Sequence, residues 1–402
     1  MVPTAGVKVE IPPTTAAFVH TGPGTLAGRY MRRFWHPICR SQDVSPGRAK
    51  PLRIMSEDFT LYRGEALPHP SPLPEGEGTT AHLLAFRCAH RGTQLSTGWV
   101  EGDDLRCFYH GWKYDASGQC IEQPAEPEPF CNRIKVRSYP TQEYLGLIFA
   151  FLGEGDPPAL PRYLDFEAPD ALCDADISEI YACNYFTRID NATDMVHVTF
   201  AHFQIDYQPA LGFQCPVVES HETAYGTVAR GRYPDGRVEQ THFFMPNLNL
   251  FKVGKRSAEE TDERDRLSWK VPVDDGHSVN FLVTRIHLAG DAAERYRATS
   301  EETAGNRARA RGNESALEIA EAILTGRMRA QDLATRPNAV ELEDLATMMG
   351  QGVIPDRRLD RLGQSDAGVT LVRKLWEREL SKLVHGLPLT AWTMQEHLEA
   401  TR

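Results

Sequence analysis

Short apolar stretches separated by turn residues dominate the first part of the chain. Runs such as FTLY, HLLAF and LGLIFAFLG are typical of antiparallel strands, because β-branched and aromatic residues recur between Gly, Pro and Asp. Before them, helical spacing begins near Gly24 and stops at Pro37. The pattern predicts an N-terminal arm and short helix over residues 1–34 and a small all-β domain over residues 35–155. Within this domain, the Pro- and Gly-rich residues 68–80 predict an exposed loop, to which the sequence assigns no function.

The second part of the chain begins after a break rich in Pro and acidic residues. The stretch GEGDPPALPR follows the last strand signal, so we expect a second domain over residues 156–402. Alternating apolar and polar positions between residues 223 and 288 predict antiparallel strands, and the Ala-, Glu- and Arg-rich sequence from Asp291 predicts helices. The expected fold class is α+β, with an all-β N-terminal domain and a C-terminal antiparallel sheet covered by helices, of the helix-grip type.

Composition and charge narrow the function further. Hydrophobic residues make up 41% of the chain and charged residues 25%, which is typical of a globular protein. The net charge of −11 argues against a nucleic-acid partner or docking on anionic lipid. The most apolar run, residues 145–152, is far shorter than the roughly 18 residues of a membrane span. The N-terminus shows no secretory signal, so we expect a cytoplasmic protein with reduced or metal-bound thiols.

Two closely spaced Cys and His pairs stand out in the predicted β domain. Cys88 and His90 form the first pair, and Cys107 and His110 form the second. Thiolate and imidazole are the usual ligands of transition metals in proteins, so these four side chains are candidate ligands. The spacing alone permits either a structural zinc ion or a Rieske [2Fe–2S] cluster, in which two Cys bind one iron and two His bind the other.

The residues around these pairs distinguish the two alternatives. The loops CAHRG and CFYHGWKYDASG resemble the ligand loops of Rieske domains in aromatic-ring oxygenases. This resemblance implies a [2Fe–2S] cluster held by Cys88, His90, Cys107 and His110. The sequence departs at Ala89, where relatives often have Pro, and we expect a change in loop rigidity rather than in ligation. The other six cysteines are expected to pack as small buried hydrophobes.

A second group of candidate ligands follows in the predicted second domain. Asn191, Asp194, His197 and His202 lie within the segment NYFTRIDNATDMVHVTFAH. On one helix, Asp194 and His197 would share a face, whereas His197 and His202 would point about 140° apart. Both histidines could therefore bind one metal only if a π-type bulge or a helix break near Thr199 brought them together.

The same segment resembles the iron-binding segment of Rieske non-haem iron oxygenases. It also lies downstream of the cluster loops, in the order that those enzymes use. The resemblance implies that His197 and His202 bind a mononuclear Fe(II). It also implies that Asp194 links this iron to the cluster of a neighbouring chain, and that Asn191 is a polar group beside the iron.

The third iron ligand is expected far downstream. The segment beginning VELEDLATMMGQG resembles the C-terminal part of the phthalate dioxygenase-like branch, which makes Asp344 the candidate and Glu343 its rival. On a helix, Asp344, Met348 and Gln351 would share one face, so the carboxylate would point toward an apolar interior and need a cation there. Relatives commonly have Gln-Glu at positions 348 and 349, so the surroundings of the iron are expected to differ.

Taken together, these resemblances imply a terminal oxygenase component. Such an enzyme hydroxylates, dealkylates or cleaves a small aromatic compound, most simply an aromatic carboxylate or aryl ether, with O2. The chain shows no dinucleotide fingerprint, so a separate flavin and iron–sulfur reductase, or a ferredoxin, must relay electrons from NAD(P)H. The resemblance also implies a homotrimer or stacked trimers. The alternative is a Rieske electron-transfer protein without catalytic iron; the sequence does not identify the substrate.

Overall fold

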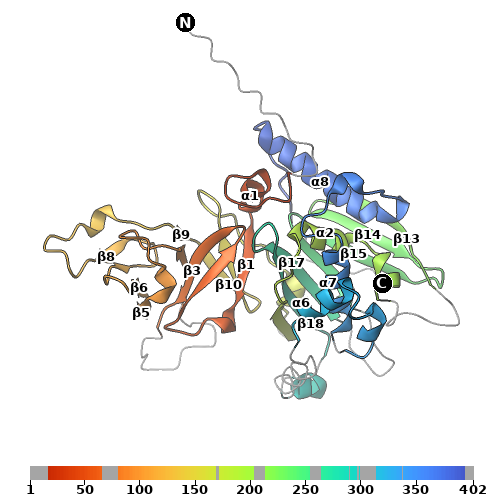
Figure 1. Cartoon of the computed structure of the whole chain (residues 1–402), viewed down its shortest axis with the longest axis horizontal. Helices are drawn as coiled ribbons and strands as arrows, with labels where there is room; N and C mark the ends of the chain where they lie inside the picture. The colour runs from red at the N-terminus through yellow and green to blue at the C-terminus, as the bar shows by residue number, and fades with distance from the viewer. Residues whose placement is uncertain are drawn as a thin grey trace, which may run out of the picture.

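A computed structural model gives the arrangement of the chain (Figure 1). The structure describes residues 17–65, 80–168, 172–202, 213–253, 264–288, 290–296, 298, 314–336 and 338–393. The predicted loop at 68–80 therefore lies outside the described residues, apart from Thr80. Within the described part of the chain, no helix combines the length and apolarity that a membrane crossing requires.

Three small antiparallel sheets build the first part of the chain. A short helix, α1, precedes them, and the Thr25 side chain caps it by accepting a hydrogen bond from the Gly28 amide (3.1 Å). The helix spans Leu26–Met31, whereas the helical spacing continues to Pro37. The residues from Trp35 to Pro37 belong instead to the first strand. The sheets are ordered β1 (Trp35–Arg40), β11 (Leu147–Phe151), β10 (Thr141–Tyr144); β2 (Ala49–Ile54), β3 (Glu57–Arg63), β4 (Ala81–Ala85), β9 (Ser138–Tyr139); and β5 (Trp99–Glu101), β6 (Asp104–Arg106), β7 (Lys113–Tyr114), β8 (Cys120–Glu122).

A seven-stranded antiparallel sheet forms the second part. Six of its strands follow one another along the chain, and the seventh, β12, joins at the far edge. The sequence did not predict β12, because its alternating Asp residues lack the apolar signal of a buried strand. The order is β12 (Leu172–Ile177), β18 (Ser278–Ile286), β17 (Arg264–Pro272), β16 (Leu248–Val253), β15 (Val238–Phe244), β14 (Gly226–Arg232), β13 (Val217–Glu222).

Helices pack over this sheet (Figure 1). The helix α2 contacts β17 and α8, while α8 also contacts β13 and β14, and the short α3 contacts α7. This arrangement confirms the α+β class and the helix-covered sheet that the periodicity predicts. The helices are α2 (Tyr185–Thr193), α3 (His197–Ala201), α6 (Ala316–Leu324), α7 (Ala339–Gly350) and α8 (Ala367–Val384), and the 3-10 turns are η2 (Ser41–Asp43), η3 (Leu95–Thr97), η4 (Cys131–Arg133), η5 (Leu164–Phe166), η6 (Ala330–Leu333), η7 (Arg357–Leu359) and η8 (Gln364–Asp366).

The two faces of β17 divide the packing of the second part. Successive strand residues point to opposite faces, so Leu267, Trp269 and Val271 share one face and are buried in a core common to both parts of the chain. On this face the Trp269 ring meets Phe149 of β11 edge-on, with ring centroids 5.6 Å apart. Lys270 points to the opposite face, which α2 covers. The shared core therefore holds one face of the large sheet against the smaller sheets. The opposite face of the large sheet packs against helices.

Candidate metal centres

The two Cys and His loops of the β domain are built alike. In each loop the Cys amide donates to the carbonyl five residues later (2.8 Å), and the glycine four residues later donates its amide to the Cys carbonyl (3.0 and 3.1 Å). These glycines, Gly92 and Gly111, have φ angles of 76° and 74°, which other residues adopt only with strain. The strand β6 ends at Arg106, so Cys107 begins the second loop.

The four predicted donors meet between these loops. The Cys88 thiol lies close enough to Cys107 to raise its pKa, and the rings of His90 and His110 lie 4.5 Å apart at 68°. Among the residues with described positions, none forms a hydrogen bond with the buried Nδ1 of His90, which is costly unless the nitrogen binds a metal. The residues present therefore fit a metal group held by two sulfurs on one side and two nitrogens on the other.

The spread of the donors distinguishes a cluster from a single zinc ion. A tetrahedral zinc site brings its ligand atoms to within roughly 3.3–3.8 Å of one another. Among the residues that the structure describes, the only trio of such donors that all lie within 4.8 Å of one another is in the second domain. The four donors of the β domain are thus spread too widely for one zinc ion, as a two-iron cluster requires.

Aromatic side chains support the cluster loops. The Trp112 ring stacks on His90 at 4.5 Å and 8°, and the buried Tyr114 hydroxyl lies 3.2 Å from Cys88 Sγ. Tyr114 also accepts the amide hydrogen of Ala89 (3.2 Å), so the position that departs from the family pattern is still held in place. Phe108, by contrast, is 68% exposed at the tip of the second loop. The four donors are therefore held by buried aromatic side chains, while the tip of the second loop is exposed to solvent.

In the second domain, a helix break precedes the first histidine. The helix α2 ends at Thr193, Asp194 is extended (φ −94°, ψ 113°), and α3 begins at His197. The Asp194 Oδ1 accepts the amides of Val196 (2.9 Å) and His197 (3.3 Å), which favours the break. The break expected near Thr199 was therefore placed wrongly, since Thr199 lies inside α3. The common helix face expected for Asp194 and His197 was also wrong, since they lie on either side of the break.

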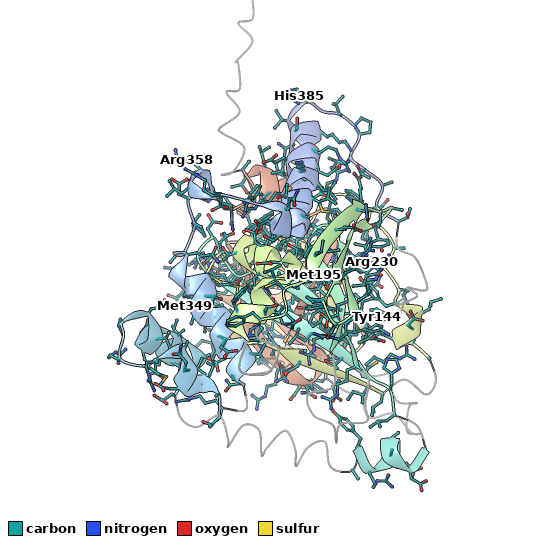
Figure 2. All side chains as sticks on the ribbon, turned by 90° about the vertical axis from the view of Figure 1, so that its right-hand side faces the viewer. Tyr144, Met195, Arg230, Met349, Arg358 and His385 are labelled. Atoms are coloured by element: carbon teal, nitrogen blue, oxygen red, sulfur yellow. The ribbon has the colours of Figure 1, made fainter. Side chains whose placement is uncertain are left out.

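Packing on the sheet holds the break in place. Met195, between α2 and α3, is buried and lies over the sheet (Figure 2). Its terminal methyl group lies so close to Gly231 of β14 that a Cβ atom there would meet it at 2.9 Å. A glycine at this position therefore lets the break approach the sheet.

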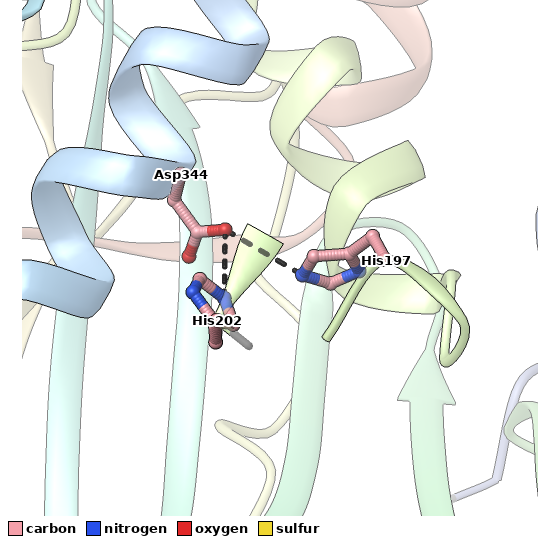
Figure 3. Close-up of side chains that lie close together, drawn as sticks. All are labelled: His197, His202 and Asp344. Carbon is pink, nitrogen blue, oxygen red and sulfur yellow. Dashed lines mark ion pairs between the residues drawn. The ribbon is translucent and has the colours of Figure 1, made fainter. Parts of the chain in front are cut away.

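The three predicted iron ligands come together at this break. The Nε2 atoms of His197 and His202 lie 3.5 and 3.3 Å from the same oxygen of Asp344, Oδ1 (Figure 3). One atom from each side chain lies within 4.8 Å of the other two. His202 is the C-cap of α3 (φ −106°, ψ 24°), so the chain has already left the helix where its side chain turns to the same point.

Hydrogen bonds fix which nitrogen of each histidine faces Asp344. The Nδ1 of His197 donates to the backbone carbonyl of Asp194 (2.6 Å), and the Nδ1 of His202 donates to Glu343 Oε2 (2.9 Å). In the neutral form of each histidine, Nε2 is then free of hydrogen and able to bind a metal, so a cation that binds here must displace the proton that His202 holds without it. Glu343, the rival candidate, is buried behind His202, so the geometry leaves Asp344 as the carboxylate that meets both rings.

The orientation of α7 differs from the prediction. Leu342, Leu345 and Met348 form its buried face, whereas the Asp344 side chain is 23% exposed and Gln351 lies at the exposed C-cap. The expectation that Asp344 points into an apolar interior with Met348 and Gln351 was therefore wrong. Asp344 lies at the border of the buried face, where it reaches the two histidines.

Contacts within the trio shift the pKa values of Asp344 and His202. Burial alone would raise the pKa of Asp344, but His197 and His202 hold that pKa well below its usual range. Burial would lower the pKa of His202, but hydrogen bonds with Asp344 and Glu343 raise it to about 9. Asn191 also donates to Asp344 Oδ1 (3.1 Å), so the carboxylate is oriented as well as ionised. Two histidines and one carboxylate on one side of a metal are the donor set of non-haem Fe(II) sites, which leave other positions open.

Two buried polar groups outside the trio, Asp190 and Lys270, hold α2 in place. Asp190 accepts two hydrogen bonds from Arg373 of α8 (3.1 and 2.9 Å) and forms an ion pair with Arg357. Buried Lys270 donates to Asn249 (2.7 Å), whose amide donates to a carbonyl near the end of α2 (3.3 Å). Their pairing across distant segments gives no local signal in the sequence.

Comparisons with known proteins agree with these observations. A family model described as the Rieske [2Fe–2S] domain matches residues 34–140. The 5,5'-dehydrodivanillate O-demethylase oxygenase subunit of Sphingobium sp. is 27% identical over 380 residues, which cover 91% of this chain and 79% of that protein. Methylxanthine N1-demethylase NdmA of Pseudomonas putida is 32% identical over 273 residues, which cover 63% of this chain and 72% of that protein. The terminal oxygenase of carbazole 1,9a-dioxygenase from Novosphingobium sp. KA1 has a similar fold, with a TM-score of 0.64, 18% identity, and 91% and 95% coverage of the two chains.

Proposed function

Since this chain belongs to the Rieske non-haem iron oxygenases, as a terminal oxygenase subunit, we propose specific residues for its two metal centres. We assign the [2Fe–2S] cluster to the side chains of Cys88, His90, Cys107 and His110. We assign the mononuclear iron to His197, His202 and Asp344. The observation that carries the second assignment is the approach of both Nε2 atoms to one oxygen of Asp344.

The family fixes the general reaction. The enzyme uses O2 and electrons from a separate electron-transfer partner to oxidise an organic substrate. When bound, the cluster supplies single electrons and the Fe(II) activates O2. The chain's own residues orient the ligands: the Asp194 carbonyl and Glu343 hold the Nδ1 hydrogens of the histidines, while Asn191 orients Asp344.

For the substrate, we propose a small aromatic compound, an aromatic carboxylate or an aryl ether, that is hydroxylated or oxidatively dealkylated. The names of two relatives, an O-demethylase and an N1-demethylase, support dealkylation. We propose NAD(P)H as the electron source, which favours a cytoplasmic location. Its electrons would arrive through a reductase with flavin and iron–sulfur groups, either directly or through a ferredoxin between the reductase and this oxygenase.

The test is a screen of aromatic acids and ethers for substrate-dependent O2 uptake with a surrogate reductase. We expect uptake with wild-type protein and at least one of these compounds, together with a hydroxylated or dealkylated product. The control is His197→Ala, which should keep the cluster spectrum but form no product. A variant that still forms product would place the active site elsewhere.

We propose further that the chains assemble as a trimer, or as stacked trimers, in which Asp194 connects the iron site to the cluster of the neighbouring chain. The cluster loops lie at one end of the long axis, beside β6 and β8, while α7 lies within the other part of the molecule (Figure 1). Phe108 and Tyr109, at the tip, are 68% and 55% exposed. Within the described residues, Asp194 Oδ2 has no hydrogen-bond partner, so it is available to a neighbouring chain.

Mixed assemblies test this arrangement. Cys107→Ala lacks the cluster and His197→Ala lacks the iron, so each variant alone should be inactive. Mixed trimers would contain contacts between an intact cluster and an intact iron site, and activity should return once native mass spectrometry shows subunit exchange. Mixed trimers that exchange subunits yet stay inactive would contradict transfer between chains.

A further inference from the structure

A second pair of thiols lies beside the cluster loops. Cys120, at the start of β8, is 2% exposed, and Cys131, at the start of η4, is partly exposed. The two thiols are neighbours that influence each other's ionisation: Cys131 raises the pKa of Cys120, as Cys88 raises that of Cys107. The part of the chain that the structure describes thus holds two thiol pairs, Cys88 with Cys107 and, next to it, Cys120 with Cys131. The first pair is assigned to the cluster, whereas nothing in the proposed function uses the second.

Backbone contacts hold the two cysteines side by side. The Cys120 amide donates to the Ile134 carbonyl (2.9 Å), and the Ile134 amide donates to the Cys131 carbonyl (3.0 Å). The Gln119 side-chain amide spans the same place and donates to the carbonyls of both cysteines (3.1 and 2.7 Å). The Cys120 thiol donates to the Glu122 carbonyl (3.6 Å), so its sulfur lone pairs remain available to Cys131. Hydrogen bonds to Ile134 and Gln119 therefore hold the backbones of Cys120 and Cys131 next to each other, which keeps the two sulfurs close.

The segment between the two cysteines covers the second cluster loop. Pro124 lies so close to Gly111 that a Cβ atom there would meet its ring at 3.0 Å. Phe130 meets Trp112 edge-on, with centroids 5.6 Å apart, and Trp112 stacks on His90. A covalent link between the ends of this segment would therefore restrain the residues that pack against the cluster ligands.

We propose that Cys120 and Cys131 form a reversible disulfide when the protein meets a peroxide. The partly exposed Cys131 reacts first: its sulfur attacks one peroxide oxygen, an S–O bond forms, the O–O bond breaks, and water leaves with the thiol proton. The Cys120 sulfur then attacks the Cys131 sulfur, an S–S bond forms, the S–O bond breaks, and a second water leaves. The two thiols lose two electrons and two protons in total, and these reduce hydrogen peroxide to two waters.

Burial sets the order of these steps. Burial and the neighbouring Cys131 raise the pKa of the Cys120 thiol to about 12, so Cys120 stays protonated at neutral pH. A protonated thiol is a poor nucleophile, so the second step should be slower than the first. A dithiol reductant should reverse the link, because thiol–disulfide exchange needs only access to Cys131.

The test uses the purified protein with its cluster intact. Wild-type protein is treated with hydrogen peroxide at a dose that leaves the visible cluster absorbance unchanged, quenched in acid, alkylated under denaturing conditions and mapped by mass spectrometry. We expect a linked Cys120–Cys131 peptide, about 2 Da lighter than the sum of the two reduced peptides, and its loss after dithiothreitol. Cys131→Ser should lose the linked peptide, and Cys120→Ala, which leaves Cys131 in place, should lose it too.

Cys173→Ser is the matched control, because Cys173 is also partly exposed and its thiol bonds to the Phe166 carbonyl rather than to another sulfur. This variant should keep the linked peptide. Wild-type protein in which both thiols remain alkylatable, or in which Cys131 reaches the sulfinic acid without a link, would overturn the proposal. Because the readout is a peptide mass, the result does not depend on the oxygenase substrate.

Discussion

Glu343→Gln tests how the site positions its second histidine. Glu343 is 4% exposed, and its Oε2 lies 2.9 Å from His202 Nδ1, so the carboxylate fixes the tautomer and makes Nε2 more basic. Glutamine has the same shape but no charge, and a neutral acceptor is roughly half as strong a partner as a carboxylate. Loss of such a partner typically weakens metal binding 10–100-fold, which is about 1.4–2.7 kcal/mol.

The assay is an anaerobic calorimetric titration of Fe(II) into protein that retains its cluster but has been depleted of the mononuclear iron. Wild-type protein gives the reference, and Glu321→Gln removes the same charge from an exposed position on the neighbouring helix α6. We expect Glu343→Gln to bind one Fe(II) with 10–100-fold weaker affinity and Glu321→Gln to bind it normally. Complete loss of iron in Glu343→Gln, with normal binding in Asp344→Ala, would refute this reasoning and make Glu343 the third ligand.

Three further results follow from the structure. Asp194→Asn should keep both metals and a reducible cluster while turnover falls by orders of magnitude; normal turnover in a steady-state assay would contradict its proposed role. Asn191→Ala removes a donor to Asp344 Oδ1 and should weaken Fe(II) binding by about 1 kcal/mol in the same titration, whereas unchanged affinity would show that this hydrogen bond does not orient the carboxylate. His36 is fully buried and its Nε2 donates to the Met31 carbonyl (2.8 Å), so burial lowers its pKa to about 4. In the unfolded chain His36 has its ordinary pKa near 6.5, so between pH 6.5 and 4 the unfolded state binds more protons than the folded state. The contribution of neutral His36 to the free energy of unfolding is therefore present above pH 6.5 and falls by about 2 kcal/mol by pH 5. Urea unfolding should show a smaller loss over this range in His36→Gln, and an equal loss would contradict the assignment.

Periodicity and motif resemblance predicted the architecture and the candidate ligands. Alternation along the later strands gave the large sheet, because one face of β17 is buried in the common core. The spacing of Cys88, His90, Cys107 and His110 placed four donors on two loops, and the structure brings those loops together. These features depend on residues that are close in sequence.

Other features depend on contacts between distant segments. The i, i+5 spacing of His197 and His202 required a break, but its position depends on the Asp194 carboxylate, which bonds two amides, and on Met195 packing against the sheet. Asp344 and Glu343 are adjacent and chemically alike, so only the orientation of α7 separates their roles. The cysteines of η4 and β8 likewise gave no signal of their contact, which arises from the folding of the intervening segment.

The iron content of purified variants tests the central claim most directly. Two centres held by separate residue sets predict about three irons per wild-type chain, and about two in Asp344→Ala with an unchanged cluster spectrum. Elemental analysis combined with the visible spectrum gives both quantities on the same sample. A preparation with zinc in place of iron, or wild-type and Asp344→Ala proteins that both contain only two irons, would contradict the account.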